Sequence, residues 1–473
     1  MSATPTATST ASLRHSLTVP LGELSDVLPA ELLERPDLRA LLDAESVTCW
    51  TTRGLGLVGF GRAASFAAVG EDRFTAARAW WDDVVEGLSI RDPLHRSATG
   101  PVAFGAFAFA RSSTRRSGLV VPELVIGHDA DGAWATLVTS AEAAPGADDV
   151  VAAAHRLLPE PRTARGSGDD RAPAGDPATA SPRALEDPAA QARWTDAVSA
   201  GIEEIRAGGV DKLVLARAVP VAAPEGARLD LPRALRRLAH DYERCWTYSV
   251  NVQDDRDPAA GRLFGATPER LVRVLDGAVH ARVLAGTVPR TSSGPATEAE
   301  RAWARERLMD DPKQRSEHEF AIGSFLDGIA AYTDAVRSPS QPYLLELPNV
   351  WHLASDVTCD LRRGPDGTVP SALELVEAVH PTAAVCGTPT TAAADAIARL
   401  EGLDRGLYAG PVGWVDARRN GDFGIALRGG VQDDEATARV FAGCGIVSAS
   451  DPAEELTETR AKLRPVLGAL GAS

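Results

Sequence analysis

The sequence is poor in cysteine, and it has no long uninterrupted run of apolar residues. The five cysteines among 473 residues are odd in number and widely spaced, and no two of them form a CxxC pair. Neither a disulfide framework nor a thiolate zinc site is therefore indicated, and we expect a reducing, cytoplasmic location. No stretch of about 18 apolar residues is present, so we expect no membrane-spanning helix.

Basic residues are also scarce relative to acidic ones. The chain has 49 Lys and Arg against 65 Asp and Glu, which gives a formal net charge of -16 at pH 7. A nucleic acid or an anionic membrane surface would need a basic stripe, so we expect neither as a partner. Hydrophobic residues make up 44% of the chain, enough for a sizeable core. Division of the length by about 150 residues per domain suggests about three domains.

Two segments lack the large apolar residues that ordering requires. Residues 1–16 are rich in Ser, Thr and Ala without the apolar run of a signal peptide, and we expect a disordered tail. Residues 159–188 are rich in Pro, Gly, Ala and Asp, which predicts a flexible loop or linker. Between them, residues 17–158 read as sheet with a few helices, one of them over 73–88, and show no clustered polar site.

After this segment, a helix and a strand can be read in succession. Apolar residues recur at helical spacing from Trp194 to Ile205, and a strand is predicted over 210–221. Lys212 would share one face of that strand with Val214. A lysine on an apolar face is costly unless it has a function or reaches solvent. The alternative is an edge-strand lysine whose amine extends to water.

Two glutamates lie in the next predicted elements. Residues 263–274 predict a strand, a turn and a second strand, with Glu269 at the turn, where an ordinary solvated carboxylate is the alternative. Thr297 and Glu300 have the spacing of a capping box, which predicts the start of a helix. Glu317 lies on the helix after that one and is followed by an apolar stripe, so we expect a buried helix.

The C-terminal stretch predicts strands followed by a helix. Residues 407–416, 421–431 and 438–450 read as three consecutive strands of an antiparallel meander. Gly443–Gly445 are expected to form a turn whose backbone N–H groups could bind an anionic group. Asp451 and Pro452 then predict a helix start.

On this last helix three charged residues share one face. Glu455, Glu458 and Lys462 follow one another at i, i+3 and i+7. A surface row of salt bridges is the usual explanation of such a pattern. The spacing alone therefore leaves open whether these side chains form a site.

The chain resembles a known family through motifs that follow one another in a fixed order. These are DKLVLAR, FGATPERLVR, LAGTVPR, DPKQRSEHE, LPNVWHLAS, VHPTAAVCGTP, RGLYAGPVGW, IALRGG and RVFAGCGIVSASDPAEELTETRAKL. Together they resemble the chorismate-utilising enzymes, and within them the isochorismate synthases of menaquinone and siderophore biosynthesis. The resemblance covers about residues 190–470.

The resemblance implies one α+β unit, the chorismate-binding fold, with two large antiparallel sheets packed face to face and helices around them. Residues 17–158 would be the more divergent N-terminal part of this fold, and residues 189–471 its catalytic region. The stretch 159–188 would then be a long loop inside one fold. A monomer is favoured.

The resemblance also implies a reaction, the Mg²⁺-dependent isomerisation of chorismate, in which water adds at ring carbon 2 and the carbon-4 hydroxyl leaves. Lys212 matches the general base and Glu269 the general acid, which calls for a lowered lysine pKa and a raised carboxyl pKa. Glu317 and Glu458 match the magnesium ligands, and Glu455 would hold a metal-bound water.

Further residues would contact the substrate. Lys462 and Thr287 with Gly286 match contacts to the ring carboxylate, while Tyr408 and Arg428 match the pair that holds the enolpyruvyl carboxylate. His352 would line the ring, with an ordinary strand histidine as the alternative. The substrate-binding set expected from the resemblance is Gly286, Thr287, His352, Ala384, Val385, Tyr408, Leu427, Arg428, Gly443 and Lys462.

Several residue positions bear on which reaction of the family takes place. The aminating enzymes lack a lysine at the position of Lys212, so its presence favours water as the nucleophile. Salicylate synthases share this lysine but carry threonine where this chain has Ala384 beside Val385. Tyr408 and Leu427 are compatible with both. We therefore expect an isochorismate synthase; the alternatives are a salicylate synthase, an aminating enzyme or a catalytically inactive subunit.

Overall fold

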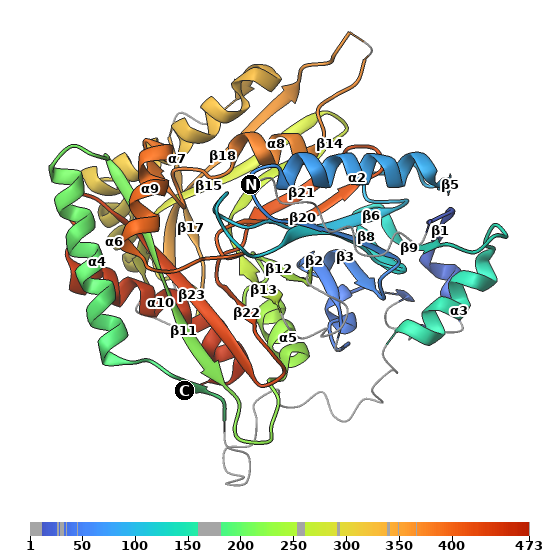
Figure 1. Cartoon of the computed structure of the whole chain (residues 1–473), viewed down its shortest axis with the longest axis horizontal. Helices are drawn as coiled ribbons and strands as arrows, with labels where there is room; N and C mark the ends of the chain where they lie inside the picture. The colour runs from blue at the N-terminus through green and yellow to red at the C-terminus, as the bar shows by residue number, and fades with distance from the viewer. Residues whose placement is uncertain are drawn as a thin grey trace.

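The computed structural model describes residues 12–25, 28, 33–34, 36–44, 46–158, 181–252, 261–290, 294–337, 341–348, 350–365 and 367–472. These residues form two extended sheets, with helices arranged around them (Figure 1). Large apolar side chains from both sheets, such as Trp50, Phe104 and Tyr248, belong to one buried cluster. The predicted α+β class with two large sheets is confirmed.

Within the described residues, the larger sheet has 13 strands, and only its β1–β5 pair is parallel. In spatial order they are β10 (Arg183–Ala184), β11 (Lys212–Ala222), β23 (Thr437–Ile446), β22 (Gly429–Gln432), β13 (Arg262–Thr267), β12 (Trp246–Val250), β2 (Thr48–Thr52), β3 (Leu55–Phe60), β8 (Leu124–Asp129), β9 (Gly132–Thr139), β1 (His15–Pro20) and β5 (Ser89–Arg91). The short β19 (Gly387–Thr388) also pairs with β11.

The second sheet has 10 strands in the part of the chain that the structure describes, all antiparallel to their neighbours. In spatial order they are β16 (Thr333–Arg337), β18 (Val350–Leu361), β15 (Ala278–Pro289), β14 (Arg270–Leu275), β21 (Gly421–Ile425), β20 (Pro411–Asp416), β6 (Val102–Ala106), β7 (Ser117–Val121) and β4 (Ala64–Ala68). β17 (Tyr343–Glu346) pairs with β18. Both sheets contain strands from the 17–158 part and from the 189–471 part.

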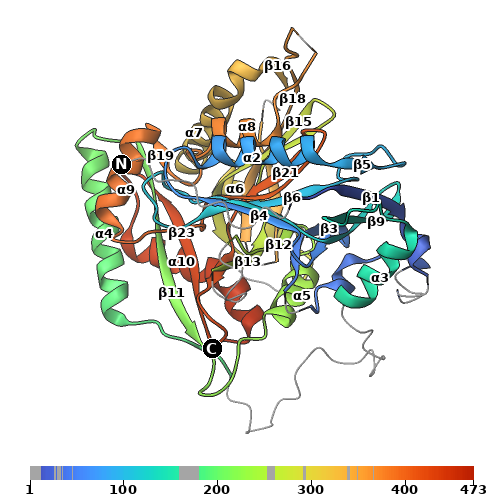
Figure 2. The same ribbon diagram turned by 45° about the vertical axis from the view of Figure 1, so that its right-hand side comes forward.

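The α-helices lie around the two sheets, with α4 and α9 at one end in both views (Figures 1 and 2). Their bounds are α2 (Arg73–Gly87), α3 (Ala147–Leu157), α4 (Pro188–Arg206), α5 (Leu231–Asp241), α6 (Glu298–Leu308), α7 (Pro312–Ile329), α8 (Ala372–Val379), α9 (Thr390–Leu400) and α10 (Pro452–Leu470). Short 3₁₀ turns are η1 (Leu21–Leu24), η2 (Leu38–Leu41) and η3 (Ala330–Tyr332). No helix among the described residues combines the length and the apolar character needed to cross a bilayer.

Several elements form where the sequence predicts them. The helix expected over 73–88 is α2, and the strand expected over 210–221 is β11. Thr297 caps α6 in a capping box with Glu300, whose backbone N–H donates to the threonine hydroxyl. Asp451 caps α10, and Pro452 stands in its first turn.

Two predicted boundaries are wrong at one end. The tail expected over 1–16 ends inside β1, because His15 and Ser16 already pair with β9 and β5. Residues 1–11 lie outside the described residues. The loop expected over 159–188 ends earlier than predicted, because β10 pairs with β11 and Pro188 begins α4. Residues 159–180 of that loop also lie outside the described residues.

The predicted C-terminal meander is wrong as well. Residues 421–431 are not one strand, because β21 belongs to the second sheet and β22 to the larger one. The chain changes direction at Leu427 and Arg428, and Arg428 has a left-handed backbone with φ of 49°. Gly443–Gly445, expected as a turn, instead lie within β23 and pair with β11.

The chain crosses from one sheet to the other at two neighbouring points. Glu269 separates β13 of the larger sheet from β14 of the second sheet, and β13–β22 and β14–β21 are neighbouring pairs. The Glu269 carbonyl accepts a hydrogen bond from the Ile425 N–H at 3.2 Å, which ties the two crossings together. Glu269 and Arg428 are therefore placed near each other by topology, although they are far apart in sequence.

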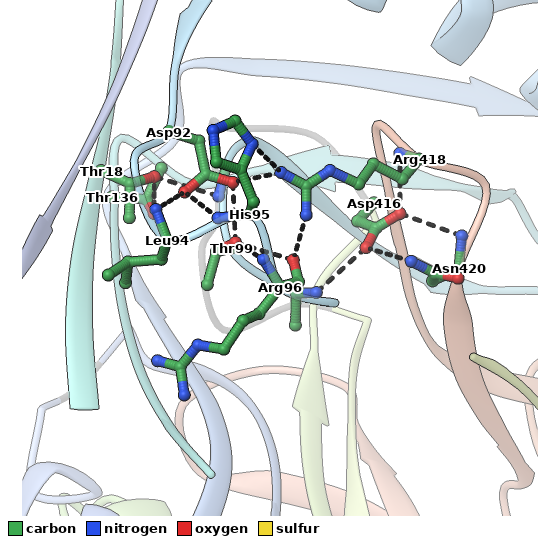
Figure 3. A network of polar contacts seen from close by, with 12 residues as sticks. Thr18, Asp92, Leu94, His95, Arg96, Thr99, Thr136, Asp416, Arg418 and Asn420 are labelled. Carbon is green, nitrogen blue, oxygen red and sulfur yellow. Dashed lines mark hydrogen bonds and ion pairs between the residues drawn. The ribbon is translucent and has the colours of Figure 1, made fainter. Parts of the chain in front are cut away.

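A polar network connects the N-terminal part to the β20–β21 hairpin (Figure 3). Buried Asp92 accepts a hydrogen bond from the Thr99 hydroxyl at 2.7 Å and forms an ion pair with Arg418 at 2.7 Å. Buried Asp416 accepts a hydrogen bond from the Ala98 backbone N–H at 3.0 Å. Residues 92–99 are thus fastened to the hairpin by charged and neutral hydrogen bonds.

Candidate active site

One pocket gathers residues from both sheets and from two helices. It encloses about 790 Å³ of space, part of which is open to solvent. All of the predicted site residues except Glu455 line it: Lys212, Glu269, Gly286, Thr287, Glu317, His352, Ala384, Val385, Tyr408, Leu427, Arg428, Gly443, Glu458 and Lys462. The structure therefore brings together side chains that span about half of the sequence.

Lys212 begins β11 and is 2% exposed. Val214 and Ala216, at alternate positions of the same strand, also line the pocket, as the predicted shared face requires. Burial lowers the pKa of the Lys212 amine, while Glu317 and Glu269 act in the opposite direction. A lysine with a lowered pKa has a larger neutral fraction, and a neutral amine can accept a proton. The edge-strand alternative does not fit this degree of burial.

Glu269 is buried at the crossing between β13 and β14. Burial raises the pKa of its carboxyl to about 8, although Lys212 and Lys462 act to lower it. The Glu269 backbone N–H donates to the Thr267 hydroxyl at 3.2 Å, which holds the turn. At neutral pH this side chain is mainly protonated and can donate a proton. An ordinary solvated turn carboxylate would not have this property.

Three side chains form a chain of hydrogen bonds along the pocket wall. Arg428 Nη2 lies 3.0 Å from His352 Nε2, and His352 Nδ1 lies 2.9 Å from Thr287 Oγ1. Because a guanidinium only donates, Nε2 must accept, and the proton of the neutral ring is then on Nδ1. Burial and the nearby Arg428 lower the pKa of His352 well below its usual value, consistent with the neutral form. The Thr287 hydroxyl accepts from Nδ1, so its own proton can point to a ligand.

Thr287 follows an irregularity in β15. The pairing with β18 shifts between Ala285 and Thr287, and Gly286 has a φ of 81°. Gln314 of α7 accepts a hydrogen bond from the Thr287 backbone N–H at 3.1 Å, and a Cβ on Gly286 would lie 2.9 Å from the same Gln314 oxygen. The positive φ is what favours glycine here, and a side chain would also have to displace the Gln314 amide.

Two residues of α10 reach the pocket. Lys462 Nζ lies 2.6 Å from Glu458 Oε1 and donates to the Gly443 carbonyl at 2.9 Å. Glu455, one turn earlier, is buried but does not line the pocket. Together with burial, Glu455 raises the pKa of the adjacent Cys444 thiol. The three residues expected on one face of the helix are therefore divided between the pocket and the interior.

Glu317 of α7 enters the pocket next to Lys212. A Cβ on Gly445 of β23 would lie 2.9 Å from Glu317 Oε1 and 3.1 Å from Lys212 Cε. The missing side chain at position 445 is what allows both groups to approach this strand. Its Cα partner in β11 is Val214, which also faces the pocket.

The donor set fits a hard, partly hydrated cation. Glu317 and Glu458 bring carboxylates into one pocket from two different helices, and Mg²⁺ is commonly held by one or two protein carboxylates, with water and substrate oxygens completing its shell. Within the described ranges, no group of three or more His, Cys, Asp or Glu side chains is assembled as a metal site. The remaining ligands would therefore have to come from water and substrate.

Sequence reasoning missed several residues of the wall. Arg405 lies inside the motif RGLYAGPVGW, but its spacing gave no sign that its guanidinium would be buried at the pocket. Phe441 stacks on the Tyr408 ring with centroids 4.9 Å apart and planes at 12°. An apolar residue in a strand carries no sequence signal that distinguishes a ring-stacking partner from ordinary core.

Comparison with known proteins identifies the class to which this fold and pocket belong. The family model described as "Chorismate binding enzyme" matches residues 41–471. The protein is therefore a member of the chorismate-binding enzymes.

Individual proteins similar to this chain include isochorismate synthases. The chain is 30% identical over 431 residues to the isochorismate synthase MenF of Bacillus subtilis, covering 88% of this chain and 86% of that protein. It is also 30% identical over 436 residues to the salicylate biosynthesis isochorismate synthase of Pseudomonas aeruginosa, covering 89% and 84%. The crystal structure of the putative 2,3-dihydroxybenzoate-specific isochorismate synthase DhbC of Bacillus anthracis superposes with a TM-score of 0.69 at 25% identity, covering 92% of this chain and 99% of that one.

Proposed function

We propose that this protein is an isochorismate synthase that converts chorismate to isochorismate with Mg²⁺. The observation that carries the proposal is the pairing of Lys212 and Glu269 in one pocket. Burial lowers the pKa of the amine and raises that of the carboxyl to about 8, so near neutral pH one group can accept a proton while the other can donate one.

In the proposed reaction the two groups act on different oxygen atoms. Lys212 removes a proton from the water that attacks ring carbon 2. Glu269 protonates the hydroxyl that leaves carbon 4, so one water enters and one leaves, and the product is an isomer of the substrate. Each group ends in the opposite protonation state, and proton exchange with solvent restores it.

The substrate carries two carboxylates, and the pocket offers cationic and neutral donors for them. Arg428 is suited to the enolpyruvyl carboxylate, because its planar guanidinium can make two parallel hydrogen bonds. Lys462 and the Thr287 hydroxyl would bind the ring carboxylate. These local charges must overcome the long-range repulsion between a chain of net charge -16 and a dianion.

Glu317 and Glu458 would hold the Mg²⁺. When bound, the ion would neutralise the ring carboxylate of the substrate and fix its orientation. Glu455 is set back from the pocket, and its predicted role with a metal-bound water remains a proposal.

Two residues favour isomerisation over the other reactions of the family. Lys212 favours water over ammonia as the nucleophile, and Ala384 stands where salicylate synthases have threonine. The intact set of Lys212, Glu269, Glu317 and Glu458 argues against a catalytically inactive subunit. A monomer working in the cytoplasm is consistent with the family resemblance and with five cysteines that are all free and buried.

The test is incubation of the purified protein with chorismate and Mg²⁺, followed by separation of the products. We expect isochorismate as the main product and no turnover after chelation of the metal. Salicylate with an equal amount of pyruvate as the main products would replace this proposal with a salicylate synthase. Turnover that requires ammonia or a glutaminase would replace it with an aminating enzyme.

A further inference from the structure

Among the residues that the structure describes, no continuous partner strand covers the edge of β11 next to the active site. β19 pairs with β11 at Lys212 and Leu213, and the Val214 N–H still donates to the Cys386 carbonyl at 2.8 Å. On the same edge, β10 resumes the pairing only at Val221. Buried backbone groups in the gap between β19 and β10 need other hydrogen-bond partners.

Two side chains supply hydrogen-bond partners at the active-site end of this gap. Glu401 Oε1 accepts a hydrogen bond from the Ala216 N–H at 2.7 Å, and Arg405 Nη2 donates to the Val214 carbonyl at 2.6 Å. The carboxylate and the guanidinium also pair with each other, with Arg405 Nε 2.9 Å from Glu401 Oε2. Both side chains are almost fully buried, with exposures of 1% for Glu401 and 2% for Arg405.

The Arg405 guanidinium reaches a second wall of the pocket as well. Its Nη1 donates to the Val385 carbonyl at 2.9 Å, and its carbon Cζ lies 4.2 Å from the centre of the Phe109 ring. Its own backbone carbonyl accepts a hydrogen bond from the Tyr408 N–H at 3.0 Å. One buried residue thus contacts the strand of Lys212, the Ala384–Val385 segment and the turn that carries Tyr408.

We propose that Arg405, with its charge balanced by Glu401, is a positioning residue that sets the placement of Lys212 relative to the Ala384–Val385 wall. The inference rests on the proposed function, because that function is what gives the position of Lys212 a catalytic purpose. A guanidinium has five donors in one plane and can bind a carboxylate and two carbonyls at once, whereas an ammonium cannot hold the same acceptors in that geometry. A buried ion pair usually adds little net stability. The positioning of neighbouring groups therefore better explains why the Glu401–Arg405 pair is buried beside the pocket.

The direct test replaces Arg405 by lysine, which keeps the charge and loses the planar fork. We expect kcat to fall by roughly ten- to a hundredfold, because small displacements of a catalytic group are costly. KM for chorismate should change much less, because Arg428 and Lys462 are untouched.

The matched control is Arg73→Lys. Arg73 is 3% exposed, donates to the Gly70 and Ala108 carbonyls and lies 4.7 Å from the Phe74 ring, but it is not among the residues that line the pocket. It should lose a comparable amount of thermal stability while keeping the wild-type kcat and KM. A loss of kcat as large in Arg73→Lys as in Arg405→Lys would reduce the effect to general destabilisation and overturn the inference.

A second variant keeps the test decisive if Arg405→Lys does not fold. Glu401→Gln retains an oxygen for the Ala216 N–H but removes the charge that orients Arg405, so kcat should fall while KM for chorismate changes much less. Wild-type kcat in the folded variant would overturn the inference while leaving the proposed function intact. A wild-type enzyme that makes no isochorismate would instead refute the proposed function itself.

Discussion

The Lys462 amine lies 2.6 Å from the Glu458 carboxylate across one turn of α10. The same carboxylate is a proposed metal ligand, and the same amine is a proposed partner of the substrate. The proposed metal ligand and the proposed substrate partner are therefore in direct contact. We expect the binding of metal and the binding of substrate to be coupled for this reason.

Removal of the Glu458 charge should weaken metal binding. We expect Glu458→Gln to raise the Mg²⁺ concentration for half-maximal activity by roughly tenfold or more, in the range found when groups around metal sites are altered. The measurement is a titration of activity with Mg²⁺ at saturating chorismate. Glu454→Gln is the matched control, because Glu454 is exposed on the same helix and should leave the titration unchanged. An unchanged titration in Glu458→Gln would remove Glu458 from the metal site.

The opposite pKa shifts in the pocket predict a bell-shaped dependence of kcat/KM on pH. Activity should fall above about pH 8, because Glu269 must be protonated to act as an acid and its pKa is raised to about 8. Activity should fall on the acid side through the lowered pKa of Lys212, because the amine must be neutral to act as a base. Profiles at saturating Mg²⁺ should show both limbs, and Glu269→Gln should lose the alkaline one. An alkaline limb that persists in Glu269→Gln would assign it to another group.

Loss of the Lys212 amine should abolish catalysis without abolishing binding. Lys212→Ala is expected to lower kcat by roughly a hundredfold to ten-thousandfold, the usual contribution of a general base. Chorismate should still bind in the presence of Mg²⁺, because Arg428 and Lys462 remain, and calorimetry can measure this. Near-normal turnover in this variant would show that the base assignment is wrong.

The polar network around Asp92 makes a prediction about stability. Asp92→Ala leaves the Thr99 hydroxyl without this acceptor and Arg418 without its ion pair. The free energy of unfolding should fall by about 1–3 kcal/mol, with a small contribution from the partly exposed Arg418 charge. Urea unfolding measures the change, and Asp131→Ala, at a side chain that is 78% exposed, is the control. Equal losses in both variants would contradict a structural role for the network.

Local elements could be predicted from sequence because local patterns determine them. The caps of α6 and α10 and the alternating face of β11 need only a few neighbouring residues to be recognised. The split of residues 421–431 into β21 and β22 could not be recognised in this way. That break depends on which sheet each half pairs with, and pairing is a long-range property.

The candidate site could likewise be predicted from the sequence only in part. Lys212 and Glu269 were found from their motifs, and their burial then gave the pKa shifts that those roles require. The position of Glu455 behind the pocket wall could not be predicted, because helical spacing places Glu455, Glu458 and Lys462 on one face without saying how deep each lies. The role of Arg405 depends on a missing stretch of partner strand, which no residue pattern reveals.

Ala384 offers a test of what keeps the reaction at the isochorismate stage. It lines the pocket beside Val385. By the family resemblance, salicylate synthases carry threonine at this position. We expect Ala384→Thr to convert part of the product to salicylate and pyruvate, because a hydroxyl at this position could assist pyruvate elimination. Ala384→Val is the matched control, since valine has nearly the shape of threonine without the hydroxyl and should release no pyruvate. Equal pyruvate from both variants would assign the effect to bulk, and none from either would show that Ala384 does not determine the product.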